Sequence, residues 1–280
     1  MLRNNSSARR KTPAKQTKET LMMAQLFDLT GKIALVTGGA GIYGAHIVRA
    51  LAQSGANVIV ASRSLGRSRS FVQRLRKEGI HAISACLDLV SESSIRNLRD
   101  KLIAEHGQLD ILVNNAVARS GGDLHQVSTQ DWETVMKVNS TGLFLACKIF
   151  SEPMQAARSG SIINIASIYG MVGPDFSIYR DTNLHNSVSY SFSKGGMINL
   201  TKYLASYLAP YGVRVNCLSP GGFRTPKMPE KFVRNYSRRT LLGRMAEADD
   251  IKGPIVFLAS EASRYITGQN IPVDGGWTAI

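Results

Sequence analysis

Cysteine is scarce in this chain, and the few cysteines form no recognisable pattern. Cys86, Cys147 and Cys217 lie far apart in the sequence. No histidine stands at a spacing that would complete a metal-binding motif with any of them, so the sequence indicates neither a disulfide framework nor a zinc site. We therefore expect no bound metal and a reducing compartment such as the cytoplasm.

Long hydrophobic runs are also lacking. No apolar stretch approaches the length that crosses a bilayer, and no apolar signal core stands near the N-terminus. The sequence therefore gives no reason to expect a membrane partner. With 280 residues, 44% of them hydrophobic, the chain is long enough for one large α/β domain with a substantial core.

Acidic residues are few, with 20 against 34 basic residues and a formal net charge of +14. The segment from Met1 to Thr20 contributes five of these fourteen charges, because it holds six basic residues and one acid. We expect residues 1–24 to form a disordered basic tail and residues 25–280 to form the folded domain. A transit peptide and a misassigned start are alternative readings of this segment. Because so much of the charge lies in the tail, no specific nucleic acid site is expected.

The most informative stretch runs from Ile33 to Gly44. Ile33–Val36 is a short apolar run, typical of a strand buried on both faces, and glycines follow it directly. From Ile42 onward the apolar residues recur with the spacing of one helical face. A glycine-rich turn that leads into a helix presents free backbone N–H groups and the positive end of the helix dipole, which together bind a pyrophosphate. A plain tight turn is the alternative.

A second apolar run, Asn57–Ala61, completes a strand–helix–strand unit. In dinucleotide-binding folds an acid at the end of this strand binds the adenosine ribose, whereas a basic residue accommodates the additional phosphate of NADP. Here Ser62 and Arg63 stand at this position, with Arg67 and Arg69 close behind. We therefore expect NADP(H) as the cofactor, with NAD(H) as the alternative, unless the arginines belong to a solvated loop.

Further strands are expected at about residues 81–86, 109–116, 161–166 and 213–218, and residues 266–276 are expected to give a last strand followed by a glycine-rich end. Several end on polar residues, among them Asp88, Asn115 and Ser167. Because open parallel sheets place ligands at the carboxyl ends of their strands, these residues mark a candidate site. A long helix is expected from Thr129 to about Arg158. Asn139 is a poor residue for its interior unless the amide forms a local contact or stabilises a kink.

The segment from Tyr190 to Lys194 carries the strongest chemical signal. A phenol and an amine at positions i and i+4 project from one helical face, one turn apart. Tyrosine titrates near about pH 10 when unperturbed, and a neighbouring ammonium lowers that pKa. The pair suits proton transfer to or from a carbinol oxygen, which Ser167 at a strand end can also contact. Taken alone, this spacing is also common in helices without any catalytic role.

Together these motifs resemble those of the short-chain dehydrogenase/reductase family, over about Leu26 to Ile280. Thr37, Gly38 and Gly44 match the family's Thr-Gly-x-x-x-Gly-x-Gly loop, although Ile42 replaces its middle glycine. Asn114-Asn115-Ala116 matches Asn-Asn-Ala-Gly, with Val117 in place of the glycine. The resemblance implies a doubly wound, Rossmann-type single α/β domain with a mostly parallel seven-stranded sheet and helices on both faces. It also implies a homodimer or homotetramer.

The resemblance assigns roles to individual positions. Tyr190 would be the proton donor or acceptor, Lys194 would lower its pKa and hold the nicotinamide ribose, Ser167 would orient the substrate oxygen, and Asn139 would support a proton relay. The implied cofactor-binding residues are Gly38, Gly41, Ile42, Tyr43, Gly44, Ser62, Arg63, Asp88, Leu89, Asn115, Ala116, Tyr190, Lys194, Pro220, Gly221, Phe223 and Thr225.

Two segments depart from the family pattern and bear on the substrate. Residues 170–189 contain a polar insertion, and residues 222–245 match the family's substrate lid with many basic residues. We predict that Arg180, His185 and Arg238 contact a polar, anionic small molecule such as a sugar acid or a sugar derivative. Charges that merely solvate a mobile lid are the alternative.

The sequence thus predicts an NAD(P)-dependent oxidoreductase that transfers hydride between the cofactor and a carbonyl or secondary alcohol. Two other functions stay open. One is a ketoreductase resembling 3-oxoacyl-acyl-carrier-protein reductase. The other is a non-catalytic dinucleotide-binding regulator, because a fold does not by itself determine function.

Overall fold

The computed structural model describes residues 23–120 and 122–280. The predicted tail, residues 1–24, lies outside the described residues except for Met23 and Ala24. These two residues belong to a helical turn at 23–26, so the predicted boundary at residue 24 falls inside that turn.

Within the described residues, seven strands form one sheet in the order β3-β2-β1-β4-β5-β6-β7. Every pairing is parallel, so the sheet expected to be mostly parallel is parallel throughout. The strands are β1 (Ile33–Thr37), β2 (Asn57–Ser62), β3 (Ala82–Cys86), β4 (Ile111–Asn114), β5 (Gly160–Ile165), β6 (Val213–Pro220) and β7 (Asn270–Val273). The order reverses between β1 and β4, which is where doubly wound sheets bind their ligands.

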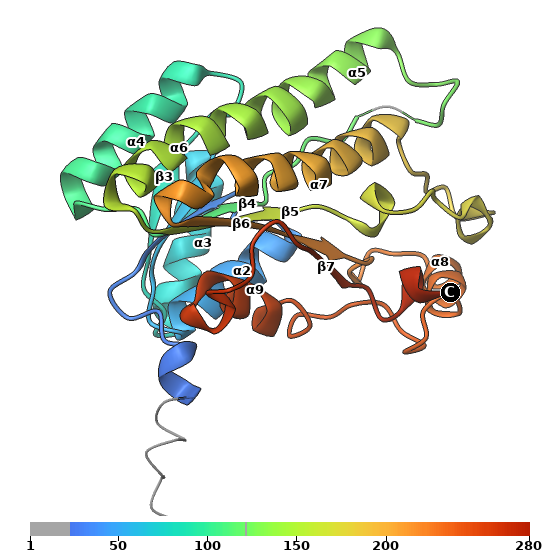
Figure 1. Cartoon of the computed structure of the whole chain (residues 1–280). Helices are drawn as coiled ribbons and strands as arrows, with labels where there is room; N and C mark the ends of the chain where they lie inside the picture. The colour runs from blue at the N-terminus through green and yellow to red at the C-terminus, as the bar shows by residue number, and fades with distance from the viewer. Residues whose placement is uncertain (1–22, 121) are drawn as a thin grey trace, which may run out of the picture.

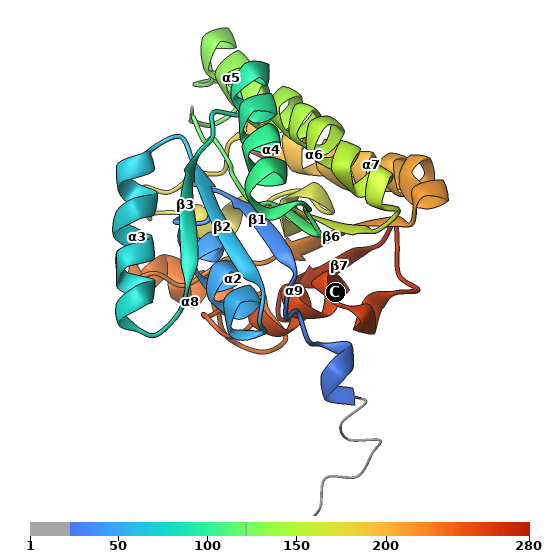
Figure 2. The ribbon, with the colours of Figure 1, turned by 90° about the vertical axis from the view of Figure 1, so that its left-hand side faces the viewer.

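Helices cover both faces of the sheet (Figures 1 and 2). One layer contains α4 (Glu92–His106), α5 (Thr129–Met136), α6 (Leu143–Ala157) and α7 (Val188–Leu208). The other contains α2 (Ile42–Gln53), α3 (Leu65–Lys77) and α9 (Lys252–Ala259), while α8 (Glu230–Ser237) lies beyond the carboxyl edge of the sheet. The predicted doubly wound α/β fold is confirmed.

Strand β1 shows why the apolar runs in this sequence are continuous. Ile33 and Leu35 pack in the core beneath α4, α6 and α7, whereas Ala34 and Val36 pack in the core beneath α2, α3 and α9. Successive side chains of a strand point to opposite faces, so a strand covered on both faces needs an apolar residue at every position.

The helix predicted from Thr129 to Arg158 is interrupted. Residues Lys137–Gly142 form a π-helical segment between α5 and α6. Within it the amide of Asn139 accepts a hydrogen bond from the Ala118 N–H at 2.8 Å and donates to the Ala118 carbonyl at 3.0 Å. A π segment often marks a functional site, and here it turns Asn139 toward the loop after β4.

A third, smaller core joins the predicted insertion to the predicted lid. Ile178 from residues 170–189 packs with Phe232 and Tyr236 of α8 and with Trp277 near the C-terminus. Ion pairs link the same segments, with Asp175 at 3.0 Å from Arg239 and Asp181 at 2.6 Å from Lys231. The polar residues of the insertion therefore serve largely to fasten it to the α8 region.

Within the described ranges, no helix has both the length and the apolar character needed to cross a membrane.

Candidate active site

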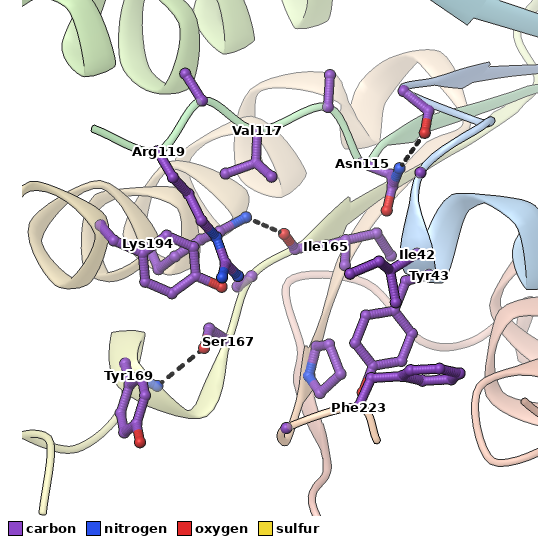
Figure 3. Close-up of a pocket in the computed structure, with 18 of the residues that line it drawn as sticks. Ile42, Tyr43, Asn115, Val117, Arg119, Ile165, Ser167, Tyr169, Lys194 and Phe223 are labelled. Carbon is purple, nitrogen blue, oxygen red and sulfur yellow. Dashed lines mark hydrogen bonds between the residues drawn. The ribbon is translucent and has the colours of Figure 1, made fainter. Parts of the chain in front are cut away.

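A cavity of about 750 Å³ runs along the carboxyl edge of the sheet. It begins at the glycine-rich turn after β1, passes the ends of β2, β4 and β5, and reaches Tyr190 on α7 and Tyr236 on α8. Figure 3 shows part of this cavity, with Arg119, Lys194 and Ser167 on one side and Ile42, Tyr43 and Phe223 on the other. The sheet therefore brings residues that are far apart in sequence to one elongated site.

At one end the glycine turn is tightly packed. Gly38 has φ +63, and a Cβ on Gly44 would lie 2.4 Å from the Gly38 carbonyl oxygen and 2.7 Å from Asn115 Nδ2. Helix α2 begins directly after Gly41, and no side chain caps its first turn. The N–H groups of that turn therefore face the cavity without a side-chain partner, as an anion-binding helix terminus requires.

The glycine turn departs from the family loop, and this departure changes the cavity wall beside the turn without closing the cavity. Ile42 lines the cavity with 59% of its surface exposed, at the position where the family has glycine. The Tyr43 hydroxyl donates to the Gly221 carbonyl at 2.8 Å, and its ring packs edge-on against Phe223 with 5.2 Å between centroids. Figure 3 shows Tyr43 and Phe223 side by side on this wall. The cavity continues past these residues toward α7.

The ends of β2 and β3 form the part of the cavity that suits an adenosine. Ser62, Arg63, Arg67 and Asp88 line it, and the next arginine along the chain, Arg69, does not. The Asp88 carboxylate also accepts the Val90 N–H at 3.0 Å, so it both shapes the turn before α4 and borders the cavity. Basic side chains and no acid follow β2 in this part of the cavity.

Asn115 fastens the end of β4 to the glycine turn. Its Nδ2 donates to the carbonyls of Thr37 and Gly38 at 3.1 and 3.0 Å. Asn114 points instead into the sheet, where its Nδ2 donates to Asn164 Oδ1 at 2.9 Å. Of the two asparagines in the Asn-Asn-Ala motif, Asn115 therefore borders the cavity and Asn114 is buried beneath it.

Tyr190, Lys194 and Ser167 meet at the other end of the cavity. Lys194 is 4% exposed, its Nζ donates to the Ile165 carbonyl at 2.5 Å, and it lies 5.7 Å from the centre of the Tyr190 ring. Burial raises the pKa of Tyr190, but the charges of Lys194 and Arg119 and a hydrogen bond with Ser167 outweigh it, so the net pKa is lowered. The pKa of Lys194 is also lowered, in its case by burial, which disfavours the charged ammonium. The site therefore holds a phenol prepared to exchange a proton.

The comparisons with known proteins agree with this arrangement. A family model described as enoyl-(acyl carrier protein) reductase matches residues 38–278. A cis-4-hydroxycyclohexanecarboxylate dehydrogenase of Sinomonas cyclohexanicum is 36% identical over 253 residues, which cover 89% of this chain and 97% of that relative. The chain belongs to the short-chain dehydrogenase/reductase family. The predicted family resemblance is thereby confirmed.

Two further members of the short-chain dehydrogenase/reductase family extend this comparison. A 3-oxoacyl-[acyl-carrier-protein] reductase of Aquifex aeolicus (strain VF5) is 35% identical, covering 89% of this chain and 98% of that protein. The crystal structure of a gluconate 5-dehydrogenase from Burkholderia cenocepacia J2315, in complex with NADP and tartrate, superimposes with a TM-score of 0.84. It is 32% identical and covers 92% of this chain and 99% of that one.

As a short-chain dehydrogenase/reductase, the protein is an oxidoreductase that acts on CH–OH groups of small molecules with a nicotinamide cofactor. The cavity fits such a cofactor, because it borders the start of α2, where no side chain caps the backbone N–H groups that a diphosphate would need. The non-catalytic regulator considered above is therefore not retained.

Not every predicted site residue of this short-chain dehydrogenase/reductase borders the cavity. The residues that do are Gly38, Gly41, Ile42, Tyr43, Ser62, Arg63, Asp88, Leu89, Asn115, Ala116, Ser167, His185, Tyr190, Lys194, Pro220, Gly221 and Phe223. Gly44, Asn139, Thr225, Arg180 and Arg238 do not line it. Gly44 shapes the turn, and Asn139 acts on the Ala118 backbone.

Arg180 and Arg238, the two arginines predicted to contact the substrate, lie outside the lining of the cavity. Both are exposed on the outer surface, because the segments that carry them pack together through a small apolar core and present their arginines outward.

Sequence reasoning missed Arg119 and an aromatic wall. Arg119 follows the Asn-Asn-Ala motif by three residues, and it lines the cavity together with Tyr169, Tyr179, Phe232 and Tyr236. The position of Arg119 after a strand end was a usable signal. No sequence signal predicted the aromatic wall, because Tyr169 and Tyr179 meet Phe232 and Tyr236, more than 50 positions further along the chain, only through the third core.

Proposed function

We propose that this protein transfers hydride reversibly between NADP(H) and a secondary alcohol or ketone of a polar small molecule, such as a sugar acid or another sugar derivative. The observation that carries the proposal is the meeting of Tyr190, Lys194 and Ser167 in one cavity that continues to the glycine turn. One half of that cavity suits a dinucleotide and the other half holds a proton-transfer group.

In the proposed mechanism a nicotinamide cofactor, when bound, would supply the hydride chemistry. Tyr190 takes the proton from the carbinol oxygen during oxidation and returns it during reduction, which its lowered pKa favours at neutral pH. Lys194 would stabilise the phenolate and hold the nicotinamide ribose, while Ser167 would donate a hydrogen bond to the substrate oxygen. Asn139 supports the site by fixing the loop that carries Ala118.

The preference for NADP(H) rests on the residues after β2. Arg63 and Arg67 border the cavity there, and neither carries an ion pair to an acid within the described ranges. A guanidinium matches a phosphate monoester in charge and in hydrogen-bond geometry. NAD(H) would leave these two charges without a partner, so we propose it as the weaker cofactor.

The polar substrate class is supported by the relatives and by the cavity. The Sinomonas relative is named for a hydroxycyclohexanecarboxylate, and the Burkholderia structure for gluconate and for bound tartrate, so both names describe carboxylates that carry hydroxyl groups. In this chain the hydroxyls of Tyr169 and Tyr179, 2.8 Å apart, line the substrate end together with His185. These groups can hydrogen-bond hydroxyls on a substrate.

A second candidate is reduction of a 3-oxoacyl thioester, which the 35% identity to the Aquifex reductase favours. Such a substrate is long and mostly apolar. It would lie against the aromatic wall and leave the cations near Tyr190 without a partner, so we place it second.

A coupled-absorbance screen tests the proposal. The purified full chain would be supplied with NADP⁺ and hydroxy acids or polyols, and separately with NADPH and ketoses, oxo acids or acetoacetyl thioesters. We expect turnover with hydroxylated carboxylates or sugars and none with the thioester. Turnover confined to the thioester would instead support the reductase, and no turnover with any alcohol or ketone would contradict the proposed function.

We infer further that the protein assembles as a homodimer or homotetramer. Phe192, Tyr203 and Tyr207 of α7 leave more than half of their surfaces exposed, and the rings of Tyr203 and Tyr207 stack with 6.3 Å between their centroids. Exposed apolar surface can mark a contact between chains. Light scattering of the purified chain measures this directly. The cytoplasmic location stays a prediction, supported by three cysteines that form no disulfide.

A further inference from the structure

Arg119 belongs to a loop whose backbone is fixed on both sides of it. Asn139 binds both the N–H and the carbonyl of Ala118, at 2.8 and 3.0 Å. On the other side, the Ser187 hydroxyl donates to the Ser120 carbonyl at 3.1 Å, and the Ser120 hydroxyl donates to Asp131. Because the residues on both sides are held by hydrogen bonds, the backbone position of Arg119 is fixed. A fixed backbone is what a preorganised binding side chain requires.

From that position the side chain reaches the reactive end of the cavity. The Arg119 guanidinium lies 4.6 Å from the centre of the Tyr190 ring, and its charge helps to lower the pKa of Tyr190. Its charge also acts on Tyr179 in the aromatic wall. Figure 3 shows Arg119 extending from the loop of Val117 toward Ser167 and Lys194.

The charge of Arg119 has no acidic partner in the described part of the chain. None of the ion pairs formed by residues 23–120 and 122–280 includes it. Asp88 is the one carboxylate among the described residues that line the cavity, and it lies at the adenosine end. The reactive end therefore contains two cations, Arg119 and Lys194, and no carboxylate to balance them.

We propose that Arg119 binds an anionic oxygen group of the substrate, a carboxylate or a phosphate, close to the carbon that reacts. The inference deepens the proposed function and rests on it. It replaces the two exposed arginines of the sequence prediction with a residue that touches the site. A guanidinium offers paired N–H donors that match both groups, and in this position it would orient the carbinol oxygen toward the Tyr190 hydroxyl.

A narrower role for Arg119 would be to favour the Tyr190 phenolate through its charge alone. The two roles predict different results. An electrostatic role alone would change the pH dependence equally for charged and neutral substrates. A binding role makes the enzyme discriminate between a charged substrate and its neutral counterpart, at a pH where Tyr190 is in the same state in every variant.

The test compares matched substrates in matched variants. D-gluconate and its neutral counterpart D-glucitol differ only in carboxylate against hydroxymethyl, and each would be oxidised with NADP⁺ on the alkaline plateau. We expect R119Q to lower the ratio of kcat/KM for gluconate to kcat/KM for glucitol by about 10- to 100-fold, because a charge-assisted hydrogen bond to the carboxylate is lost. R119K should recover part of the loss. Arg234, which is exposed on α8 and does not line the cavity, provides the control variant R234Q.

A binding measurement makes the result independent of turnover. Titration of the NADP⁺-loaded protein with tartrate, inorganic phosphate and neutral threitol should show binding of at least one anion, with the stronger one identifying the group. R119Q should weaken that binding about 10-fold or more and R234Q should not. No anion binding to the wild-type protein, or equal binding by R119Q, would overturn the inference. The proposed function itself would stand as long as any alcohol is oxidised, so the two failures are distinguishable.

Discussion

The ammonium of Lys194 lies 5.7 Å from the centre of the Tyr190 ring, one helical turn further along α7. A buried ammonium needs hydrogen-bond acceptors, and the Ile165 carbonyl at the end of β5 provides one at 2.5 Å. The last residue of the strand therefore sets where the cation lies relative to the phenol. Both positions depend on the packing of α7 against the sheet.

Replacing Lys194 with methionine should move the pH dependence of oxidation upward. Oxidation needs Tyr190 as the phenolate, so kcat/KM rises as pH rises through the Tyr190 pKa, which Lys194 helps to lower. Without that charge we expect the rise to occur about 1 pH unit or more higher. Lys202→Met, on the exposed face of α7, is the matched control. An unchanged profile in Lys194→Met would exclude this role for the lysine.

Exchange of Arg63 and Arg67 for alanine should weaken the preference for NADP⁺ over NAD⁺. Both side chains border the cavity after β2, whereas Arg69 does not. Loss of charge-assisted bonds to one phosphate should reduce the ratio of the two kcat/KM values by about 10-fold or more. Arg69→Ala should leave the ratio unchanged. A double variant that keeps the wild-type ratio would argue that NADP⁺ is not preferred through these residues.

The two glycines at positions 44 and 66 should respond oppositely to alanine. A Cβ on Gly44 would meet backbone at 2.4 Å, so Gly44→Ala should distort the turn and weaken NADPH binding severely. Gly66 in α3 has open space around it, so Gly66→Ala should raise the free energy of unfolding by up to about 1 kcal/mol. Denaturant unfolding and NADPH titration measure the two effects. Normal NADPH affinity in Gly44→Ala would show that the turn does not bind the diphosphate.

Arg180→Ala and Arg238→Ala should change KM for an anionic substrate by less than about twofold, because both side chains are exposed and away from the cavity. The sequence alone had predicted the opposite. Steady-state kinetics with gluconate decide between the two, and a large increase in KM in either variant would place the substrate nearer the outer surface of the lid than the cavity does.

The sequence was sufficient to predict those parts of the structure that short-range patterns determine. A strand buried on both faces must be apolar at each position, so β1 and β2 could be located to within a residue. The spacing of Tyr190 and Lys194 predicts their common helical face for the same reason.

Such short-range patterns do not predict contacts between segments that are distant in the sequence. The π segment forms because Asn139 binds the backbone of Ala118, 21 residues away, and no periodicity records that contact. The basic lid looked like a binding surface in sequence, but Arg239 and Lys231 pair there with acids of the insertion. Charge composition could not reveal which arginines already had partners.

The most direct test of the account is Tyr190→Phe, which removes one hydroxyl and preserves the ring. We predict that kcat for alcohol oxidation falls by about 100- to 10,000-fold because the proton acceptor is lost. The dissociation constant for NADPH, measured by fluorescence titration, should remain within about threefold of the wild-type value, since the glycine turn and the β2 arginines are unaffected. Full turnover by the phenylalanine variant would contradict the assignment of Tyr190 as the group that transfers the proton.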